Sequence, residues 1–270
     1  MYTHFCPNFN LFLTNNFGSA KLYPILKRAG ILMKNVLITG GSRGIGRACV
    51  EKFASEGYTV SFIYNNSVQQ AGELAEKTGA YAIKTDVSRS DDALAAVKAA
   101  INYMGNVDIL INNAGISCIK LFTETTDEDY YNIMNTNFGG TFFVTREVAK
   151  SMISRHQGRI INIGSMWGRV GASCEVAYSA SKAAIEGFTK ALAKELGPSG
   201  ICVNCIEPGV IDTEMNAELD EETIRGLCDE TPVGRMGKAE EIAGFIFSIA
   251  TEKSGFLTGQ IIGFDGGYAI

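Results

Sequence analysis

Short apolar runs alternate with longer amphipathic stretches along most of the chain, and this alternation constrains the fold more than any other feature. The short runs are rich in Val, Ile and Leu, which is typical of parallel strands buried on both faces. The longer stretches have the apolar spacing of helices. We therefore expect a single-domain α/β fold, a doubly wound parallel sheet of about seven strands with helices on both faces.

The expected elements follow one another in a regular order. Strands are expected at residues 36–39, 59–64, 80–85, 108–111, 159–163, 203–206 and 260–264. Helices are expected at residues 45–56, 91–104, 126–156, 177–196 and 239–250. A doubly wound sheet binds its ligand at the carboxyl ends of the strands, so residues directly after strands are the first candidates for a site.

The first 32 residues differ from the rest of the chain. Phe5, Phe9 and Phe12 are interrupted by asparagines, with no basic start and no cleavage site typical of a secretory signal. We interpret residues 1–32 as an N-terminal extension that is disordered or not native, with a partner-binding segment as the alternative. Residues 33–270 form the expected domain.

The composition excludes several classes of partner. The chain has 270 residues, a net charge of −5 and a pI near 5.2, which argues against binding to nucleic acid or to an anionic membrane. No run of about 20 apolar residues is present, so we expect no membrane-spanning helix.

The cysteines and histidines indicate no metal site. Seven dispersed cysteines are typical of reduced thiols in a cytoplasmic protein. Cys202 and Cys205 have a CxxC spacing, but they fall in an expected strand, where residues three apart point to opposite faces. His4 and His156 are the only histidines, so we expect neither histidine-based catalysis nor a bound metal.

A glycine-rich turn with the sequence TGGSRGIG joins the first expected strand to the first helix at residues 39–46. Glycine permits a tight turn and a close approach of the backbone to a pyrophosphate, which free N–H groups at the helix start stabilise. The turn lacks the GK[ST] ending of a phosphate-transfer loop. The candidate cofactor-binding residues here are Gly40, Ser42, Arg43, Gly44, Ile45 and Gly46.

The residues after the second strand indicate which dinucleotide is bound. Asn65 and Asn66 stand there, without an acidic residue to bind a ribose 2′-hydroxyl. The guanidinium of Arg43 could instead bind a 2′-phosphate. We therefore expect NADP (NADPH) rather than NAD. Asp86, followed by Val87 after the third strand, could accept a hydrogen bond from the adenine amino group, with a turn residue as the alternative.

Three polar residues in the second half of the chain can carry proton transfer. Reduction of a ketone leaves charge on its oxygen, and Tyr178 can donate the proton that this oxygen needs. Lys182 lies one helical turn further on, where its charge is expected to lower the pKa of the tyrosine. Ser165, at the end of the fifth strand, can hydrogen-bond the substrate oxygen.

Together these motifs resemble the short-chain dehydrogenase/reductase family. The resemblance rests on TGGSRGIG, on NNAG at 112–115, on YSASK at 178–182 and on Pro208-Gly209 followed by Thr213, and it spans about residues 33–270. It implies a Rossmann fold and a homotetramer with an interface through the helices at 126–156 and 177–196. It also implies that Asn137 holds a water in a proton relay from the lysine. Further implied cofactor contacts are Asn113, Ala114 and Gly115 beside the adenosine, then Pro208 and Gly209, with Ile211 and Thr213 at the nicotinamide.

Within the family, the C-terminal half most resembles the 3-oxoacyl-[acyl-carrier-protein] reductases. The residues that carry this likeness are GRIINIGS at 158–165, AKELGP at 193–198 and TGQ at 258–260. A carrier protein is acidic and should meet a basic rim, for which Arg155, Arg159, Lys190 and Lys194 are candidates.

Residues 165–168 and 171–175 also resemble the branch that reduces a 5-aminopentanone group on a lysine of elongation factor P. Trp167 could line an apolar substrate pocket, or it could pack in the core. Glu175 could pair with a substrate amine, or it could favour the start of a helix. Glu207 departs from the small or amide residue usual at its position, and the acidic stretch 216–230 is placed to act as a lid.

A non-catalytic, dinucleotide-binding regulator on the same fold is the alternative from another class. The complete set of Ser165, Tyr178 and Lys182 argues against it, because a sensor needs no proton donor.

Overall fold

The structure, a computed structural model, describes residues 35–217 and 220–270. These residues belong to one compact unit. The interpretation of residues 1–32 lies outside the described residues.

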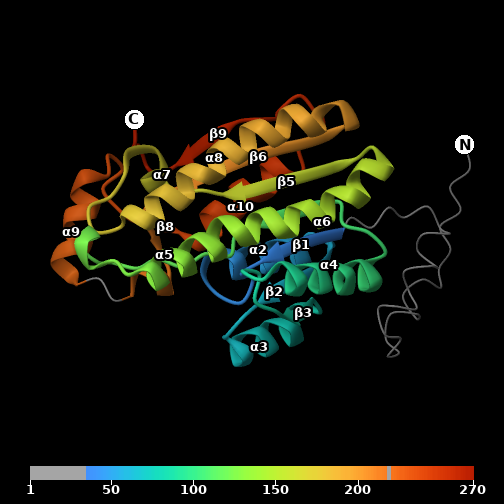
Figure 1. The fold of residues 1–270 in the computed structure, drawn as a ribbon, viewed down its shortest axis with the longest axis horizontal. Coiled ribbons are helices and arrows are strands. Elements are labelled where there is room, and N and C mark those ends of the chain that lie inside the picture. The colour runs from blue at the N-terminus through green and yellow to red at the C-terminus, as the bar shows by residue number, and fades with distance from the viewer. Residues whose placement is uncertain (1–34, 218–219) are drawn as a thin grey trace, which may run out of the picture. The chain divides into compact units, whose positions relative to one another are not determined.

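Seven strands form a parallel sheet in the order β3-β2-β1-β4-β5-β6-β9 (Figure 1). This confirms the predicted doubly wound sheet. A small second sheet pairs β7 (Ile211–Asp212) with β8 (Gly237–Lys238). The strands of the main sheet are β1 (Asn35–Thr39), β2 (Thr59–Tyr64), β3 (Tyr81–Lys84), β4 (Ile109–Asn112), β5 (Gly158–Ile163), β6 (Ile201–Pro208) and β9 (Ile261–Phe264).

Helices cover both faces of the sheet, and each layer encloses its own apolar core (Figure 1). On one face, Phe53 and Phe62 are fully buried beneath α2 (Gly44–Ser55), α3 (Val68–Thr78) and α10 (Ala239–Ala250). On the other face, Leu110 and Met152 are buried beneath α4 (Ser90–Met104), α6 (Gly140–Arg155) and α8 (Val176–Leu196). Burial of both faces explains why the strands are almost continuously apolar.

The helix expected at residues 126–156 is interrupted, which corrects the prediction. It consists of α5 (Asp127–Met134), a π-helical turn (Asn135–Gly139) and then α6. Thr126 and Asp129 form a capping box at the start of α5. A π-helical turn inserts an extra residue into the ladder and is often found at functional sites.

Three helices were not specified by the sequence pattern, because each buries little or is very short. In α3 only Ala71 and Leu74 are buried. The helix α7 (Met166–Val170) has five residues. The helix α9 (Glu221–Glu230), in the expected lid, buries no side chain.

Two buried asparagines face each other at the carboxyl ends of β4 and β5. Asn112 and Asn162 are register partners, and Asn112 Nδ2 donates to Asn162 Oδ1 at 2.9 Å. Asn112 Nδ2 also donates to Thr145 Oγ1 at 2.7 Å, and Asn162 Nδ2 donates to Thr189 Oγ1 at 2.9 Å. The network ties the sheet to α6 and α8 directly below the predicted site.

Candidate active site

The glycine turn leaves β1 at the point where the strand order of the sheet reverses, between β1 and β4. Gly40 and Gly44 have φ angles of +65° and +50°, which favour glycine. A Cβ on Gly46 would lie 2.1 Å from the carbonyl oxygen of Gly40. The turn therefore requires glycine at Gly46 for space and at the other two positions for conformation.

Asn113, directly after β4, braces this turn. Its Nδ2 donates to the carbonyl oxygens of Thr39 and Gly40 at 3.1 and 3.0 Å. The backbone N–H groups of Asn113 and Ala114 both donate to Thr39 Oγ1 at 3.0 Å. The resemblance implied a place beside the adenosine, and the bracing role of the amide was not predicted.

The start of α2 fits a pyrophosphate. Arg43, its N-cap, makes no side-chain cap, and the first N–H groups of a helix have no acceptor within it. Thr213 closes the other side, with its Cγ2 3.3 Å from where a Cβ on Gly44 would stand. Ser42 is buried in the turn and Ile45 is half-buried.

The residues expected around the adenosine differ in exposure and in the contacts they already make. Arg43, Asn65 and Asn66 are exposed, and Arg43 has no ion-pair partner among the described residues. Asp86 Oδ1 accepts from the N–H of Ser88 at 3.0 Å, so this residue also serves as a turn residue. Val87 has a buried side chain that packs against Gly140.

The predicted catalytic residues come together at the carboxyl end of β5. Ser165 caps α7, where its Oγ accepts from the N–H of Trp167 at 3.2 Å. Tyr178 and Lys182 lie in the first turns of α8, with Lys182 Nζ 5.6 Å from the centre of the Tyr178 ring. All three residues are buried.

The π-helical turn points Asn137 into this cluster. Asn137 Nδ2 donates to the carbonyl oxygen of Ile116 at 2.9 Å and to Ser181 Oγ at 3.0 Å, and its Oδ1 accepts from the N–H of Ile116 at 2.8 Å. A Cβ on Gly115 would lie 3.4 Å from Asn137 Oδ1 and 3.5 Å from Lys182 Nζ. A side chain at Gly115 would therefore crowd the space between these two groups.

Burial dominates the proton affinities of the site. It raises the pKa of Tyr178 to about 12, an effect that the neighbouring Ser165 hydroxyl partly opposes. Burial also lowers the pKa of Lys182 to about 8. The net shift of the tyrosine pKa is therefore upward, so burial outweighs the lowering expected from Lys182. The phenol is protonated at neutral pH and can donate.

The loop after β6 closes the side of the site where the nicotinamide is expected. Pro208 pairs with Phe264, and a Cβ on Gly209 would lie 2.7 Å from the Cα of Asp265. Ile211 is buried in β7. A cavity of about 350 Å³ is lined by residues 209–211, by residues 263–267 and by Thr231, Val233, Arg235, Gly237 and Glu241.

Trp167 contributes to a wall beside Ser165. It is half-buried, and its ring contacts that of Tyr268 edge to face at 5.3 Å. The Tyr268 hydroxyl donates to Glu230 at the end of α9. Trp167 thus lies at the border of the site rather than in the core. Tyr268 and Glu230 were missed because the sequence does not show that the chain end returns to the lid.

Glu175 is the N-cap of α8, but its side chain makes no capping hydrogen bond. Burial raises the pKa of the Glu175 carboxyl. The negative charge of Glu175 adds to the rise in the pKa of Tyr178 that burial causes. Its carboxylate thus makes no hydrogen bond to the start of the helix, although it stands where a negative charge favours a helix N-terminus.

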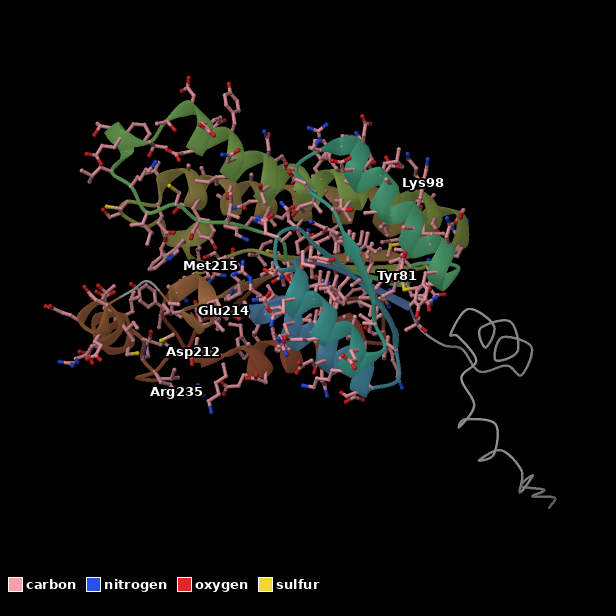
Figure 2. All side chains as sticks on the ribbon, turned by 90° about the horizontal axis from the view of Figure 1, so that it is seen from below. Tyr81, Lys98, Asp212, Glu214, Met215 and Arg235 are labelled. Carbon is pink, nitrogen blue, oxygen red and sulfur yellow. The ribbon has the colours of Figure 1, made fainter. Side chains whose placement is uncertain are left out.

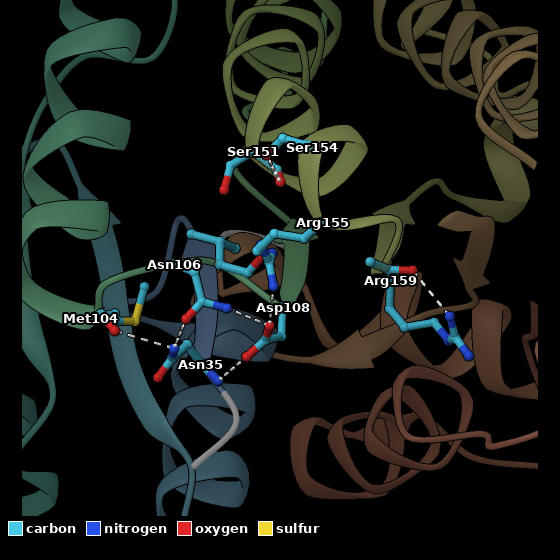
Figure 3. A network of polar contacts seen from close by, with 10 residues as sticks. Asn35, Met104, Asn106, Asp108, Ser151, Ser154, Arg155 and Arg159 are labelled. Atoms are coloured by element: carbon cyan, nitrogen blue, oxygen red, sulfur yellow. Dashed lines mark hydrogen bonds and ion pairs between the residues drawn. The ribbon is translucent and has the colours of Figure 1, made fainter. Parts of the chain in front are cut away.

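The predicted basic rim is wrong. Arg155 Nη1 pairs with Asp108 at 2.6 Å, and Asp108 holds the N–H of Asn35 where β1 begins (Figure 3). Arg159 Nη2 donates to the carbonyl oxygen of Glu252. Both arginines lie at the amino ends of the strands, because Arg155 ends the helix that precedes β5. Lys190 and Lys194 lie in the later turns of α8, away from Tyr178.

The rim at the carboxyl ends is acidic instead. Asp212 and Glu214 lie on the side of the unit opposite Tyr81, where β3 begins (Figure 2). Among nearby basic side chains, Lys120 pairs with Asp129 at 2.6 Å and Arg235 with Glu241 at 2.8 Å. Further exposed acidic residues in the segments that follow β4 and β7 are Glu124, Asp127, Glu128, Asp220, Glu221, Glu222, Asp229 and Glu230.

Neither a metal cluster nor a membrane span is found within 35–217 and 220–270. No group of three or more His, Cys, Asp or Glu side chains could hold a metal ion there. No helix in the same ranges is long and apolar enough to cross a bilayer.

The fold and the gathered Ser, Tyr and Lys define a class of protein, the NAD(P)-dependent oxidoreductases that act on ketone or alcohol groups. The chain belongs to the short-chain dehydrogenase family, whose family model matches residues 34–224. It is therefore an enzyme, and the alternative of a non-catalytic regulator is not supported.

Relatives of similar length share the sequence and the fold. The chain is 39% identical to the 3-oxoacyl-[acyl-carrier-protein] reductase FabG of Aquifex aeolicus, over 86% of this chain and 95% of the relative. It is 36% identical to the uncharacterized oxidoreductase YmfI of Bacillus subtilis, over 87% and 98%. A short-chain dehydrogenase/reductase from Serratia marcescens superposes with a TM-score of 0.82 at 37% identity, over 88% and 98%.

Proposed function

We propose that this enzyme is an NADPH-dependent reductase that converts the ketone of a 3-oxoacyl-[acyl-carrier-protein] to a secondary alcohol. The main support is the likeness to reductases of that name over nearly their whole length. The burial of Ser165, Tyr178 and Lys182 near the carboxyl end of β5 supports the reduction of a ketone as the reaction.

The choice of NADPH rests on the exposed Arg43 beside Asn65 and Asn66. A guanidinium without an ion-pair partner among the described residues can bind a 2′-phosphate through two hydrogen bonds. The segment that follows β2 offers no carboxylate for a ribose hydroxyl. The glycine turn would hold the pyrophosphate, and the reduced nicotinamide, when bound, supplies the hydride.

The chain's own residues handle the proton. The Ser165 hydroxyl orients the substrate oxygen, and the protonated phenol of Tyr178 donates to that oxygen as charge develops. Lys182, when charged, stabilises the phenolate that remains. Asn137 holds the loop at Ile116 next to the lysine, where a water could return the proton.

The test is oxidation of NADPH in the presence of an acetoacetyl thioester. We expect turnover by the parent protein, and loss of at least about a hundredfold in kcat for Tyr178→Phe, with NADPH binding retained. Ser179→Ala is the control, since that hydroxyl bonds only the N–H of Ala172 outside the cluster. A Tyr178→Phe variant that keeps full turnover would contradict the proposed proton donation by Tyr178.

A second substrate is favoured by the charge around the site. The exposed acidic residues at the carboxyl ends of the strands would repel an acidic carrier protein and attract a cation. Glu175, three residues before Tyr178, has a carboxylate that makes no capping hydrogen bond to α8. The alternative is therefore reduction of a ketone that bears an amine, as in the 5-aminopentanone group on a lysine of elongation factor P.

Two measurements separate the substrates. Mass spectrometry of elongation factor P after deletion of the gene shows an unreduced lysine adduct if the alternative holds, and a normal protein if the carrier-protein substrate holds. With purified enzyme, Glu175→Gln should lower kcat/KM for an amino ketone while leaving that for the corresponding plain ketone unchanged. Equal selectivity before and after the substitution would remove the role of Glu175.

We also propose a cytoplasmic homotetramer. The described cysteines are all free thiols, which supports a reducing compartment. Phe138 and Phe142 contact Phe188 of α8 at ring distances of 5.9 Å, and Phe142 is exposed on this helical face. Light scattering coupled to size-exclusion chromatography tests the assembly, and a monomeric mass would contradict it.

A further inference from the structure

Glu207 is a buried carboxylate at the end of β6 that the reduction described above does not use. Its side chain is 1% exposed, and its Oε2 lies 2.7 Å from Arg169 Nη2. A carboxylate in the interior is costly unless it is paired. The pair with Arg169 is thus a specific feature of this chain, at a position where the family resemblance predicts a small or amide residue.

Glu207 packs beneath the backbone that carries Ser165. A Cβ on Gly164 would lie 3.0 Å from Glu207 Cγ and 2.8 Å from Cys205 Sγ. Gly164 stands between Ser165 and Ile163, whose carbonyl oxygen accepts the hydrogen bond of Lys182. The position of the Glu207 side chain therefore affects the segment on which two proposed catalytic groups depend.

Arg169 links this carboxylate to two further parts of the site. It lies in α7, the helix that Ser165 caps and that also holds Trp167. Its Nη1 donates to the carbonyl oxygen of Ala269 at 3.1 Å, and the neighbouring Tyr268 contacts the Trp167 ring. The short helix α7 is therefore fixed by the ion pair with β6 on one side and by the chain end on the other.

The charged groups around Glu207 come from every element packed against it. Glu186 faces it from α8, and Cys205 precedes it on β6, with Lys182 beyond that thiol. Asp265 approaches from the segment after β9, since its Oδ2 and Arg169 Nη1 lie 3.4 and 3.5 Å from where a Cβ on Gly263 would stand.

Burial, followed by the carboxylate of Glu186, raises the pKa of Glu207 to about 7, and Arg169 opposes this rise. Burial raises the pKa of the Cys205 thiol to about 12, so that thiol stays neutral. Glu207 therefore changes charge near neutral pH.

We propose that Glu207 is a positioning residue, which through its ion pair with Arg169 fixes α7 and so places the Ser165 hydroxyl and the Trp167 ring. The inference rests on the role proposed for Ser165. When Glu207 is ionised the ion pair holds α7 against β6. When Glu207 is protonated the pair weakens, α7 loosens and the serine is misplaced.

Trp167 gives a readout that needs no substrate, because it is the only tryptophan in the chain. We expect its fluorescence to change in one step as pH rises from about 5.5 to about 8.5, with a midpoint near the pKa of Glu207. The step should be absent in Glu207→Gln, which keeps the shape of the side chain and removes its charge. Arg169→Met should remove the same step.

Turnover of an acetoacetyl thioester gives the second readout. In the parent protein kcat should rise with pH from about 5.5 to about 7.5 as Glu207 ionises, and should level off or fall above that as Lys182, whose pKa burial lowers to about 8, loses its charge. In Glu207→Gln this rise should be lost and kcat should stay about tenfold below the parent value at pH 8, with KM for NADPH unchanged. A small displacement of Ser165 affects the reacting geometry more than cofactor binding.

Asp108→Asn is the matched control, because it breaks a partly buried ion pair with Arg155 at the opposite edge of the sheet. It should lower thermal stability yet keep both the fluorescence step and the rise in kcat. A Glu207→Gln protein that retains both would overturn the proposal. If Tyr178→Phe instead keeps full turnover, the proposed function fails, while the fluorescence step still tests the link from Glu207 to α7.

Discussion

Lys182 Nζ donates a hydrogen bond of 2.9 Å to the carbonyl oxygen of Ile163, two residues before Ser165. This bond fixes the ammonium of α8 to the carboxyl end of β5 without any ligand. Lysine and serine are therefore located against the same strand, although 17 positions separate them in the chain.

The buried ammonium should make Lys182 costly for stability and necessary for turnover. Its folded-state pKa of about 8 lies below the ordinary 10.5, so the folded protein binds fewer protons than the unfolded chain between these values, and stability rises with pH there. At pH 7 the cost of burying the charge is fully present. We expect Lys182→Met to be more stable by about 2 kcal/mol at pH 7, after the lost hydrogen bond is counted.

The same variant should lose at least about a hundredfold in kcat. Chemical unfolding at pH 7 and at pH 10 measures the first effect, and the gain should shrink at the higher pH. If Lys182→Met is less stable than the parent at pH 7, the pKa shift has another cause than burial.

The glycine turn predicts a sharp contrast between two alanine substitutions. Gly46→Ala should weaken NADPH binding at least about tenfold, because its Cβ would stand 2.1 Å from the Gly40 carbonyl oxygen and the turn must move. Gly72→Ala in the exposed part of α3 meets nothing within 4 Å and should stabilise the protein by about 0.5–1 kcal/mol. Calorimetric titration with NADPH and thermal unfolding measure the two effects, and equal NADPH affinities would contradict the first.

Arg43 should determine the choice between the two dinucleotides. Arg43→Ala removes the guanidinium proposed to bind the 2′-phosphate, so the Kd for NADPH should rise about tenfold to a hundredfold while that for NADH stays constant. Arg47→Ala, which removes an ion pair with Glu51 in the same helix, is the control. Parallel losses for both dinucleotides would show that Arg43 has no selective role.

Asn137 should matter for both stability and catalysis. Asn137→Ala leaves the backbone groups of Ile116 and the hydroxyl of Ser181 without their partner, which costs about 1–3 kcal/mol. Asn135→Ala changes an exposed side chain in the same π-helical turn and should be nearly neutral. Chemical unfolding and kcat of both variants distinguish the two positions, and similar behaviour would argue against the inward role of Asn137.

The strands and the grouping of Ser165, Tyr178 and Lys182 were predictable because they depend on local pattern. A short, nearly continuous apolar run indicates a buried strand, and parallel strands bring their carboxyl ends to one edge of the sheet. All seven strands of the main sheet were predicted by this argument. The positions of polar residues directly after β1, β4, β5 and β6 then followed.

The remaining features depend on contacts between distant segments, which local pattern does not contain. The ion pair of Arg169 with Glu207 and the bond of Tyr268 with Glu230 each join residues 38 positions apart. The prediction of a basic rim was wrong for a related reason. The sequence shows that Arg155 carries a positive charge, but it does not show that Asp108 is its ion-pair partner. The π-helical turn was missed because Asn135–Gly139 continues the helical pattern on both sides.

The amide pair of Asn112 and Asn162 has a consequence for how β4 and β5 align. If either strand slid by a single residue, each amide would point to the opposite layer and find only hydrocarbon there. The hydrogen bonds of Asn112 and Asn162 thus favour the correct register of β4 and β5, although neither asparagine is one of the proposed catalytic residues. The relative position of the ends of β4 and β5, which are followed by Asn113 and Ser165, is thus set by the bonds among Asn112, Asn162, Thr145 and Thr189.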